Sequence, residues 1–348
     1  MSRLQVPAGA PLLVRTPNWV GDAVMALPFF DALRHNFPSS PVAALARPHA
    51  ADIAGLAPGV EVIVHDDRGL RAGTVGRVVA ARELARRRFA AAFLLPNSFS
   101  AALVPFLARI PARVGYSKDA RGLLLTHPLP WDRQARGLHR SRAYLELLAR
   151  LGLDVPPDPR PRARLPGALV ADAEGLLQAA GVEPSERLAA VAPGAVGASR
   201  RWPAERFGDV ARILAERLRC RVLILGGPGD RAAAETVSRR AGPAAVNLTG
   251  AARLALLPAL IARCDALVSN DSGAAHVASL TDTPTLVLFG AGNETITRPL
   301  GPGIHILRVH LDCTPCESNS CARGDLACMT ALDAPAVAAA VLRLVRTD

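Results

Sequence analysis

Lysine is almost absent from this chain of 348 residues. Lys118 is the only lysine, so 40 of the 41 basic side chains are arginines. Aromatic residues make up 4% of the chain, and no basic run is interleaved with them. Nucleic-acid surfaces usually combine the two, so we expect no nucleic-acid partner. The 41 basic against 30 acidic residues still give a net charge of +11, which favours an anionic membrane face or a phosphorylated substrate.

Long apolar runs are also missing, although half of the residues are hydrophobic. A membrane-spanning helix needs roughly 18–20 apolar residues in a row, and the longest such stretch, Phe89 to Ile110, is interrupted by prolines, serines and an asparagine. The segment Met1 to Pro17 has no apolar run of the kind that marks an export signal. The composition excludes a disordered chain and a small disulfide-rich scaffold. We therefore expect a cytoplasmic globular protein.

The order of the elements predicts two α/β domains. Short β-like runs alternate with helical stretches, which is typical of parallel sheets with crossover helices. Five prolines in 153–167 block both helix and sheet pairing, so this segment is predicted to be a linker. The expected parts are an α/β domain over 1–152, the linker, a second α/β domain over 168–333 and a closing helix within 334–348. The ligand is expected in the cleft between the carboxyl ends of the strands.

Individual elements follow from the same patterns. Strands are expected at 11–15, 42–46, 61–64, 90–95 and 113–116, and then at 188–192, 221–225, 245–248, 266–269 and 285–289. Helices are expected at 23–35, 140–151, 204–219, 231–241, 254–263, 274–280 and 335–345.

In the first half, polar residues cluster directly after the first expected strand, in Thr16–Asp22. Gly21 permits a tight turn, and Asp22 is expected at the start of the following helix. Two interpretations of Asp22 stay open. Aspartate is a favoured N-cap, and a carboxylate facing the cleft could also take a proton from a hydroxyl group.

In the second half, three strand-to-helix turns could bind parts of a ligand, and two of them suit an anion. Gly194, Arg200 and Arg201 lie in the first, where backbone N–H groups and guanidinium groups suit a phosphate, although a solvated surface turn fits equally well. Asp230 ends the second, a glycine-rich turn, where it could bind ribose hydroxyls or cap the next helix. The third contains Asp271, Ser272, Gly273 and His276. It opens a helix whose dipole favours an anion, with His276 either packed in the core or donating to a phosphate.

The motif D-x-D is absent from the sequence, as are H-E-x-x-H and G-x-S-x-G. The lack of D-x-D argues against a divalent metal that holds a diphosphate, a role that would pass to arginines and helix N-termini.

Six cysteines complete the candidate residues. Cys220 and Cys264 lie beside expected strands and are predicted to be small buried hydrophobes. Cys313, Cys316, Cys321 and Cys328 follow the spacing C-x2-C-x4-C-x6-C. In a cytoplasmic protein such a group suggests a structural zinc site more than disulfides; free thiols or a redox-labile loop are the alternatives.

Four segments resemble glycosyltransferase family 9, in the family's order and in both halves of the chain. They are PNWVGDAVMALP (17–28), FLLPNSFSAALVPFLARIPARVGY (93–116), APGAVGASRRWP (192–203) and VSNDSGAAHVASL (268–280). The WVGD and NDSG-x-x-H-x-A elements carry the family resemblance. The segment PNSFSAALVPF is similar to the heptosyltransferase II branch, which acts on lipopolysaccharide.

The resemblance implies a GT-B fold, with two Rossmann-like domains facing across a cleft. The N-terminal domain would bind the acceptor and the C-terminal domain ADP-heptose. Asp22 would be the general base, with Asn18, Trp19, Gly21, Asn97 and Ser98 on the acceptor side. Arg200 would hold the donor phosphates where relatives usually carry lysine, although Arg201 could share that role. Asp230 would contact the ribose, and Gly194 with Asp271–Gly273 and His276 would line the diphosphate site.

The implied reaction is an inverting, metal-independent transfer of heptose from ADP-L-glycero-D-manno-heptose to the heptose of the lipopolysaccharide inner core, with no required cofactor. The implied location is the cytoplasmic face of the inner membrane, with peripheral contact to its anionic surface and to the lipid A–core acceptor. Alternatives are another family 9 transferase, resembling heptosyltransferase I or acting on a protein, and a non-enzymatic nucleotide-binding protein. The turn Gly290–Glu294 departs from the family's Gly-Pro-Ser/Thr pattern.

Overall fold

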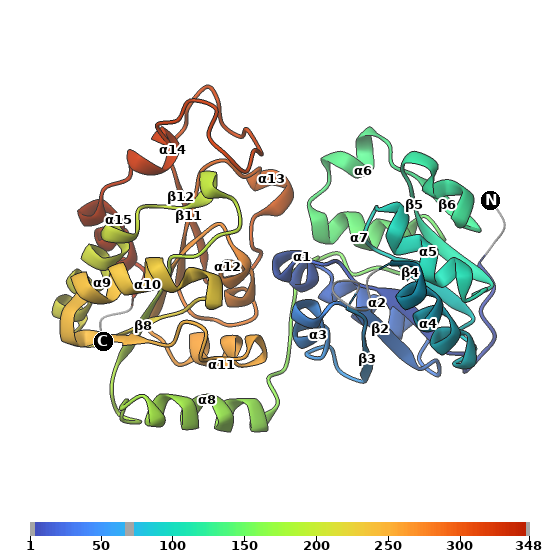
Figure 1. Cartoon of the computed structure of the whole chain (residues 1–348), viewed down its shortest axis with the longest axis horizontal. Helices are drawn as coiled ribbons and strands as arrows, with labels where there is room; N and C mark the ends of the chain where they lie inside the picture. The colour runs from blue at the N-terminus through green and yellow to red at the C-terminus, as the bar shows by residue number, and fades with distance from the viewer. Residues whose placement is uncertain (1–3, 67–72, 346–348) are drawn as a thin grey trace. The chain divides into compact units, whose positions relative to one another are not determined.

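The computed structural model describes residues 4–66 and 73–345. The chain divides into two compact units, Met1–Arg164 and Leu165–Asp348 (Figure 1). The division falls inside the proline-rich segment 153–167. Residues 346–348 of the expected closing segment lie outside the described residues.

The first unit is built on a six-stranded sheet in the order β3-β2-β1-β4-β5-β6, with every neighbouring pair parallel. Strands β1, β2 and β4 are nearly all apolar and buried along their whole length, as expected when helices cover both faces of a sheet. The strands are β1 (Leu12–Arg15), β2 (Val42–Ala46), β3 (Val60–Val64), β4 (Ala91–Leu94), β5 (Ala112–Ser117) and β6 (His127–Pro130).

Helices cover both faces of this sheet. Phe29 on α2 packs edge-on against Phe93 of β4, whereas Ala92 and Leu94 join a cluster with α4, α5 and the 3-10 helix η2 on the opposite face. The helices are α1 (Val20–Met25), α2 (Leu27–Asn36), α3 (Pro48–Ala54), α4 (Gly73–Arg86), α5 (Phe99–Leu107), η2 (Asp119–Leu124), α6 (Arg133–Gly137) and α7 (Arg140–Ala149).

The single helix expected over 23–35 is wrong, because α1 and α2 are separate helices that meet at Ala26. Pro28 lies in the first turn of α2. Proline has no N–H to donate into a preceding turn and is well tolerated where a helix begins. The chain therefore restarts its helix at this point.

The second unit repeats the plan, with a parallel sheet in the order β12-β11-β10-β7-β8-β9. Its strands are β7 (Leu188–Ala192), β8 (Arg221–Ile224), β9 (Ala245–Asn247), β10 (Ala266–Asn270), β11 (Thr285–Phe289) and β12 (Ile304–Arg308). Its helices are α8 (Gly167–Ala179), α9 (Ala204–Leu218), α10 (Arg231–Ala241), α11 (Leu257–Ala262), α12 (Gly273–Ala278), α13 (Glu294–Thr297), α14 (Ala327–Thr330) and α15 (Ala334–Leu342), with short 3-10 turns η3 (Ala198–Arg200), η4 (Pro228–Asp230), η5 (Gly242–Ala244) and η6 (Leu254–Leu256).

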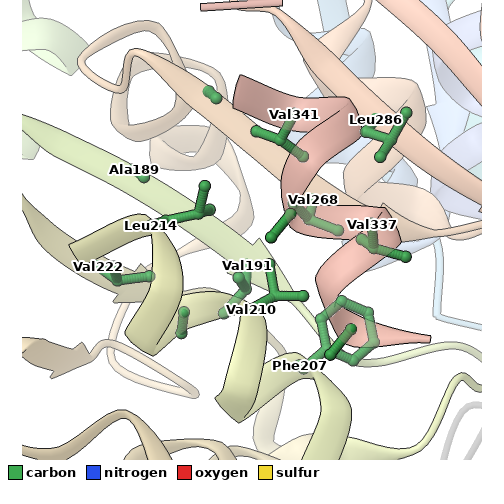
Figure 2. Close-up of a cluster of buried hydrophobic side chains, with 14 of the residues drawn as sticks. Ala189, Val191, Phe207, Val210, Leu214, Val222, Val268, Leu286, Val337 and Val341 are labelled. Carbon is green, nitrogen blue, oxygen red and sulfur yellow. The ribbon is translucent and has the colours of Figure 1, made fainter. Parts of the chain in front are cut away.

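Two helices close the core of this unit. In Figure 2, Phe207, Val210 and Leu214 on α9 and Val337 on α15 point toward Val268 of β10. The spacing of 207, 210, 211, 214 and 218 places these buried residues on one face of α9. Residues near the C-terminal end of the chain thus complete the core around strands β7 and β10.

The α/β prediction of two parallel sheets is confirmed, but the sequence patterns missed two edge strands. Strand β6 carries Pro128 and Pro130, which argue against a strand, yet it pairs through β5 on one side only, where a missing N–H is tolerated. Strand β12 is the other edge strand. Its sequence, IHILR, alternates in polarity only as far as Ile306, so it gives a weak strand signal.

Candidate functional site

The three turns predicted to bind a donor come together at one edge of the second sheet. They follow β7, β8 and β10, and β7 lies between the other two strands. The carboxyl ends of parallel strands meet at the same edge, which is where ligands of open α/β sheets usually bind. The turn after β11, residues 290–294, joins them because β11 pairs with β10.

An ion pair lies at the centre of this edge. The Nη1 atom of Arg200 is 3.3 Å from Oδ2 of Asp271, whose side chain is only 2% exposed while that of Arg200 is 31% exposed. Neither this Oδ2 nor Nε of Arg200 has a hydrogen-bond partner, so the attraction is electrostatic. Gly292 leaves the space for Asp271, since a Cβ there would lie 2.3 Å from Oδ2.

Burial raises the pKa of Asp271 to about 6, while the nearby Arg200 charge opposes the rise. Desolvation disfavours the ionised carboxylate more than Arg200 favours it. With a pKa of about 6 the carboxylate is still mostly ionised at neutral pH and pairs with Arg200, and a bound phosphate group would compete with it for the guanidinium.

The raised pKa predicts a pH dependence of stability. The folded protein holds the Asp271 proton up to about pH 6, whereas the unfolded chain releases it near 3.8. Stability should therefore fall as the pH rises through this window, by up to about 3 kcal/mol. Urea unfolding of the wild type and of Asp271→Asn at several pH values measures the difference, which should grow from pH 4 to pH 6 and then level off. Parallel pH profiles for the two proteins would contradict this.

Asn270, which lies beside Asp271, ties the Arg200 turn to the sheet. Its Oδ1 accepts from the N–H of Trp202 at 3.1 Å, and its Nδ2 donates to the carbonyl of Pro193 at 2.7 Å. The residue is fully buried. It spans the start and end of the turn after β7, so it holds the loop closed. Asn270 directly follows the strand expected at 266–269 and begins the NDSG element, but the sequence predicted no role for its side chain.

Ser199, adjacent to Arg200, is held by residues 318 and 319, which lie between Cys316 and Cys321. Its N–H donates to the carbonyl of Asn319 at 3.1 Å, and its hydroxyl donates to the carbonyl of Ser318. The N–H of Glu317 in turn donates to the carbonyl of Ala291 at 2.8 Å. Residues 317–319 therefore brace both the turn that carries Arg200 and the turn that packs on Asp271. No local sequence pattern indicates this contact.

Asp230 contacts the same site from the β8 turn. Its Oδ2 accepts from the N–H of Gly227 at 2.9 Å, and its carboxyl group packs on Gly194, where an added Cβ would lie 2.4 Å from it. It makes no side-chain cap for α10, which begins at Arg231. Asp230 thus occupies the N-cap position of α10, but its carboxyl group bonds back into its own turn instead of capping that helix.

The remaining predicted donor residues lie nearby. Arg201 is exposed, and its Nε donates to the carbonyl of Ala195 at 2.8 Å, so Arg200 is the arginine that pairs with Asp271. Ser272 precedes α12, and its hydroxyl lies 3.3 Å from that of Ser269. Gly273 begins α12, and His276 is buried within it.

In the first unit, Asp22 is the third residue of α1. Trp19 occupies the N-cap position, because its carbonyl accepts from the N–H of Ala23 at 2.9 Å. The interpretation of Asp22 as an N-cap is therefore wrong. Its negative charge acts on Tyr144 of α7, whose pKa is raised first by burial and then by Asp22. The carboxylate is half-buried beside the start of α1.

The turn before Asp22 is fixed by a buried arginine. Arg15, at the end of β1, donates to the side-chain oxygen of Asn18 and to the carbonyl of Thr16, each at 2.8 Å. Trp19 is 57% exposed and Gly21 is half-buried. The predicted acceptor residues after β1 thus sit on a rigid turn that presents an aromatic surface.

Asn97 and Ser98 follow β4, which is a neighbour of β1, so they share its edge of the sheet. Ser98 caps α5 by accepting from the N–H of Ala101 at 3.3 Å, and Oδ1 of Asn97 is buried without a hydrogen-bond partner. Arg121, fully buried, donates to the carbonyls of Leu94 and Pro96. Burial lowers its pKa to about 10. The role of Arg121 in holding the end of β4 and the turn that carries Asn97 was not predicted.

All six cysteines are free. Cys220 and Cys264 are buried, as expected. Within residues 4–66 and 73–345, which include all four clustered cysteines, no three His, Cys, Asp or Glu side chains are arranged to hold a metal ion. Cys313 and Cys316 are exposed and Cys328 is buried, yet the pKa of Cys328 is raised by burial and then by the charges of Cys313, Cys316 and Cys321, so these three thiols lie within electrostatic range of it. The zinc interpretation therefore stays a prediction, beside the free-thiol and redox-labile-loop alternatives.

Among the described residues, no helix is both long and apolar enough to cross a membrane. The family model for glycosyltransferase family 9 (heptosyltransferase) matches residues 77–327. A relative, lipopolysaccharide heptosyltransferase 2 of Salmonella typhimurium strain LT2, is 30% identical over 310 residues, which cover 86% of this chain and 88% of the relative.

Solved structures agree in fold. The E. coli ADP-heptose lps heptosyltransferase II matches with a TM-score of 0.81 at 24% identity, covering 97% of this chain and 98% of that one. A glycosyl transferase family 9 structure from Veillonella parvula matches with a TM-score of 0.86 at 21% identity, covering 99% of both chains. The fold is thus the GT-B fold of these transferases, and the extent of the family match makes the protein a glycosyltransferase. The chain belongs to glycosyltransferase family 9 (heptosyltransferase).

Proposed function

We propose that this protein transfers heptose from ADP-L-glycero-D-manno-heptose to the heptose of the lipopolysaccharide inner core, with inversion at the anomeric carbon. The relatives named as lipopolysaccharide heptosyltransferase 2 support the substrates. One observation of this chain carries the proposal: Arg200, paired with Asp271 but still 31% exposed, stands at the carboxyl edge of the second sheet beside the start of α12. A diphosphate bound there would gain a guanidinium and free N–H groups.

The chemistry divides between the two units. Asp22 takes the proton of the acceptor hydroxyl, whose oxygen attacks the anomeric carbon of the donor. The bond between that carbon and the diphosphate oxygen breaks, and ADP leaves with the electron pair. Arg200 and the N–H groups at the start of α12 stabilise the charge that develops on the leaving group. A single direct displacement inverts the anomeric centre.

A transfer assay tests the proposal. Purified protein is incubated with ADP-heptose and with inner-core acceptors that carry no heptose, one heptose, or a heptose on a peptide. ADP should be released only with the acceptor that already carries heptose. Release with the heptose-free core would indicate a heptosyltransferase I-like activity, and release with the peptide a protein heptosyltransferase. If no acceptor promotes release although ADP-heptose binds, the protein is a nucleotide-binding protein without transfer activity.

Metal independence gives a further prediction, since Arg200 and helix N–H groups can replace a cation at the diphosphate. Turnover should be unchanged, within about twofold, when EDTA is present and no Mg²⁺ is added. Loss of turnover that Mg²⁺ restores would refute it. Circular dichroism in the same buffer separates this result from unfolding caused by removal of a metal from the cysteine segment.

We also propose that the protein works as a peripheral protein at the cytoplasmic face of the inner membrane, because the proposed acceptor is anchored there by lipid A. The net charge of +11 supports this location.

A further inference from the structure

The outer helical layer of the first unit exposes an unusual amount of apolar surface. Helices α4 and α5 and the 3-10 helix η2 pack together on one face of the sheet (Figure 1). Ten large hydrophobic side chains are exposed in the described part of the chain, and six belong to this layer. We call the four of these in α5 and η2 the apolar surface: Phe99, Phe106, Leu107 and Leu123. Val79 of α4 lies beside Ile63 and Val64 of β3 instead.

The apolar surface follows from helical geometry. In α5, residues 99, 106 and 107 are spaced to lie on one side of the helix, while Ala102 and Val104 face the core. Leu123 in the adjoining η2 is 85% exposed. These side chains are solvated although the helices are well packed beneath them, and such clusters typically mark an interaction surface.

The same part of the chain carries most of the positive charge. The unit Met1–Arg164 contains 23 basic and 12 acidic residues, a net charge of +11, whereas Leu165–Asp348 contains 18 of each and is neutral. Residues 73–123 alone contain nine basic and two acidic residues, a net charge of +7.

Basic side chains border the apolar surface directly. The guanidinium of Arg113 lies 5.4 Å from the ring centre of Phe106, and Nε of the same arginine donates to the carbonyl of Leu124 at 2.7 Å. Arg109 is exposed just beyond the end of α5. A surface of aromatic and aliphatic side chains with arginines at its margin matches the interface of an anionic bilayer, where apolar groups enter the acyl boundary and cations meet the headgroups.

We infer that the exposed side of α5 and η2 is the surface by which this protein lies on an anionic lipid bilayer. A second copy of the chain is a poor occupant, because two surfaces of this charge repel each other. The inference rests on the proposed function for the lipid nature of the acceptor, and α5 begins at Phe99, directly after the acceptor-side residues Asn97 and Ser98. An acceptor held in the bilayer would thus emerge beside the predicted acceptor segment.

The test is flotation of the full-length protein with vesicles. The wild type should bind vesicles of phosphatidylglycerol and phosphatidylcholine in equal parts, should bind phosphatidylcholine alone at least about tenfold more weakly, and should be released by high salt. The double variant Phe106→Ser, Leu107→Ser should bind the anionic vesicles at least about tenfold more weakly than the wild type does. Leu123→Asp, at the most exposed position, is a second variant that should fold normally. Val170→Ser, in α8 of the neutral unit and 43% exposed, is the matched control and should bind like the wild type.

The outcomes separate this inference from the proposed function. Heptose transfer to a soluble, delipidated acceptor should be unchanged in both surface variants. If the wild type itself transfers no heptose, that result counts against the proposed function and not against the membrane surface. The inference is overturned if the wild type fails to bind anionic vesicles, or if both variants bind as well as Val170→Ser. A dimer in size-exclusion chromatography that Leu123→Asp dissociates, without vesicle binding, would assign the surface to a second copy instead.

Discussion

Replacement of Asp22 by asparagine should lower the rate of heptose transfer by about 10²–10⁴-fold, the usual cost of removing a general base. The affinity for ADP-heptose should not change, because the predicted donor residues all belong to the other unit. Stability should fall by less than about 1 kcal/mol, since a negative charge is lost from the first turn of α1. Turnover, donor affinity and melting temperature measured on this one variant test all three expectations.

A matched control for this variant is Asp52→Asn, which makes the same change in the neighbouring helix α3. It should leave turnover unaltered. Asp22 lies inside α1, and the N-cap position belongs to Trp19. Near-normal turnover of Asp22→Asn could therefore not be explained by asparagine capping the helix in place of aspartate. It would mean that another group accepts the proton.

Arg200→Ala should weaken ADP-heptose binding by about 1.5–3 kcal/mol, the range for a hydrogen bond to a charged group, or roughly 10–150-fold in Kd. Arg200→Lys should lose much less. The alanine variant also leaves Asp271 buried without its counter-charge, so it should unfold more easily. Calorimetric titration with ADP-heptose measures the affinity.

The double variant Arg200→Ala, Asp271→Asn separates the two effects. Without the buried carboxylate it should regain stability, yet its donor affinity should stay low. Arg201→Ala is the matched control, because Arg201 is exposed and its Nε is used within its own loop. A larger loss of affinity in Arg201→Ala than in Arg200→Ala would reverse the assignment.

The parts of the site that could be predicted from the sequence are those that local patterns determine. Apolar runs followed by glycine-containing turns located the segments around Arg200, Asp230 and Asp271, because parallel strands necessarily bring such turns to one edge. Burial of the central strands likewise follows from their composition. The order of strands and helices was predicted correctly even where a helix boundary was not, as at Pro28.

What could not be predicted depends on distant backbone groups. Asn270 binds Pro193, Ser199 binds Ser318, and Arg121 binds the carbonyls that end β4. Asparagine, serine and arginine occur in many surroundings, and only the fold determines which carbonyl each one meets. Cysteine spacing likewise does not determine whether the thiols of 313, 316, 321 and 328 bind a metal ion, and among the described residues no three side chains are arranged to hold one.

The hydrogen bonds that residues 318 and 319 form with Ser199 have a consequence for folding during synthesis on the ribosome. Ser318 follows Ser199 by 119 residues, so the turn that carries Arg200 is translated long before the carbonyls that hold it. Domains tend to fold as they emerge, from the N-terminal side, and the first unit can be complete while this turn still lacks its support. Competence to bind the nucleotide sugar should therefore arise late in synthesis, after the chain has passed Asn319.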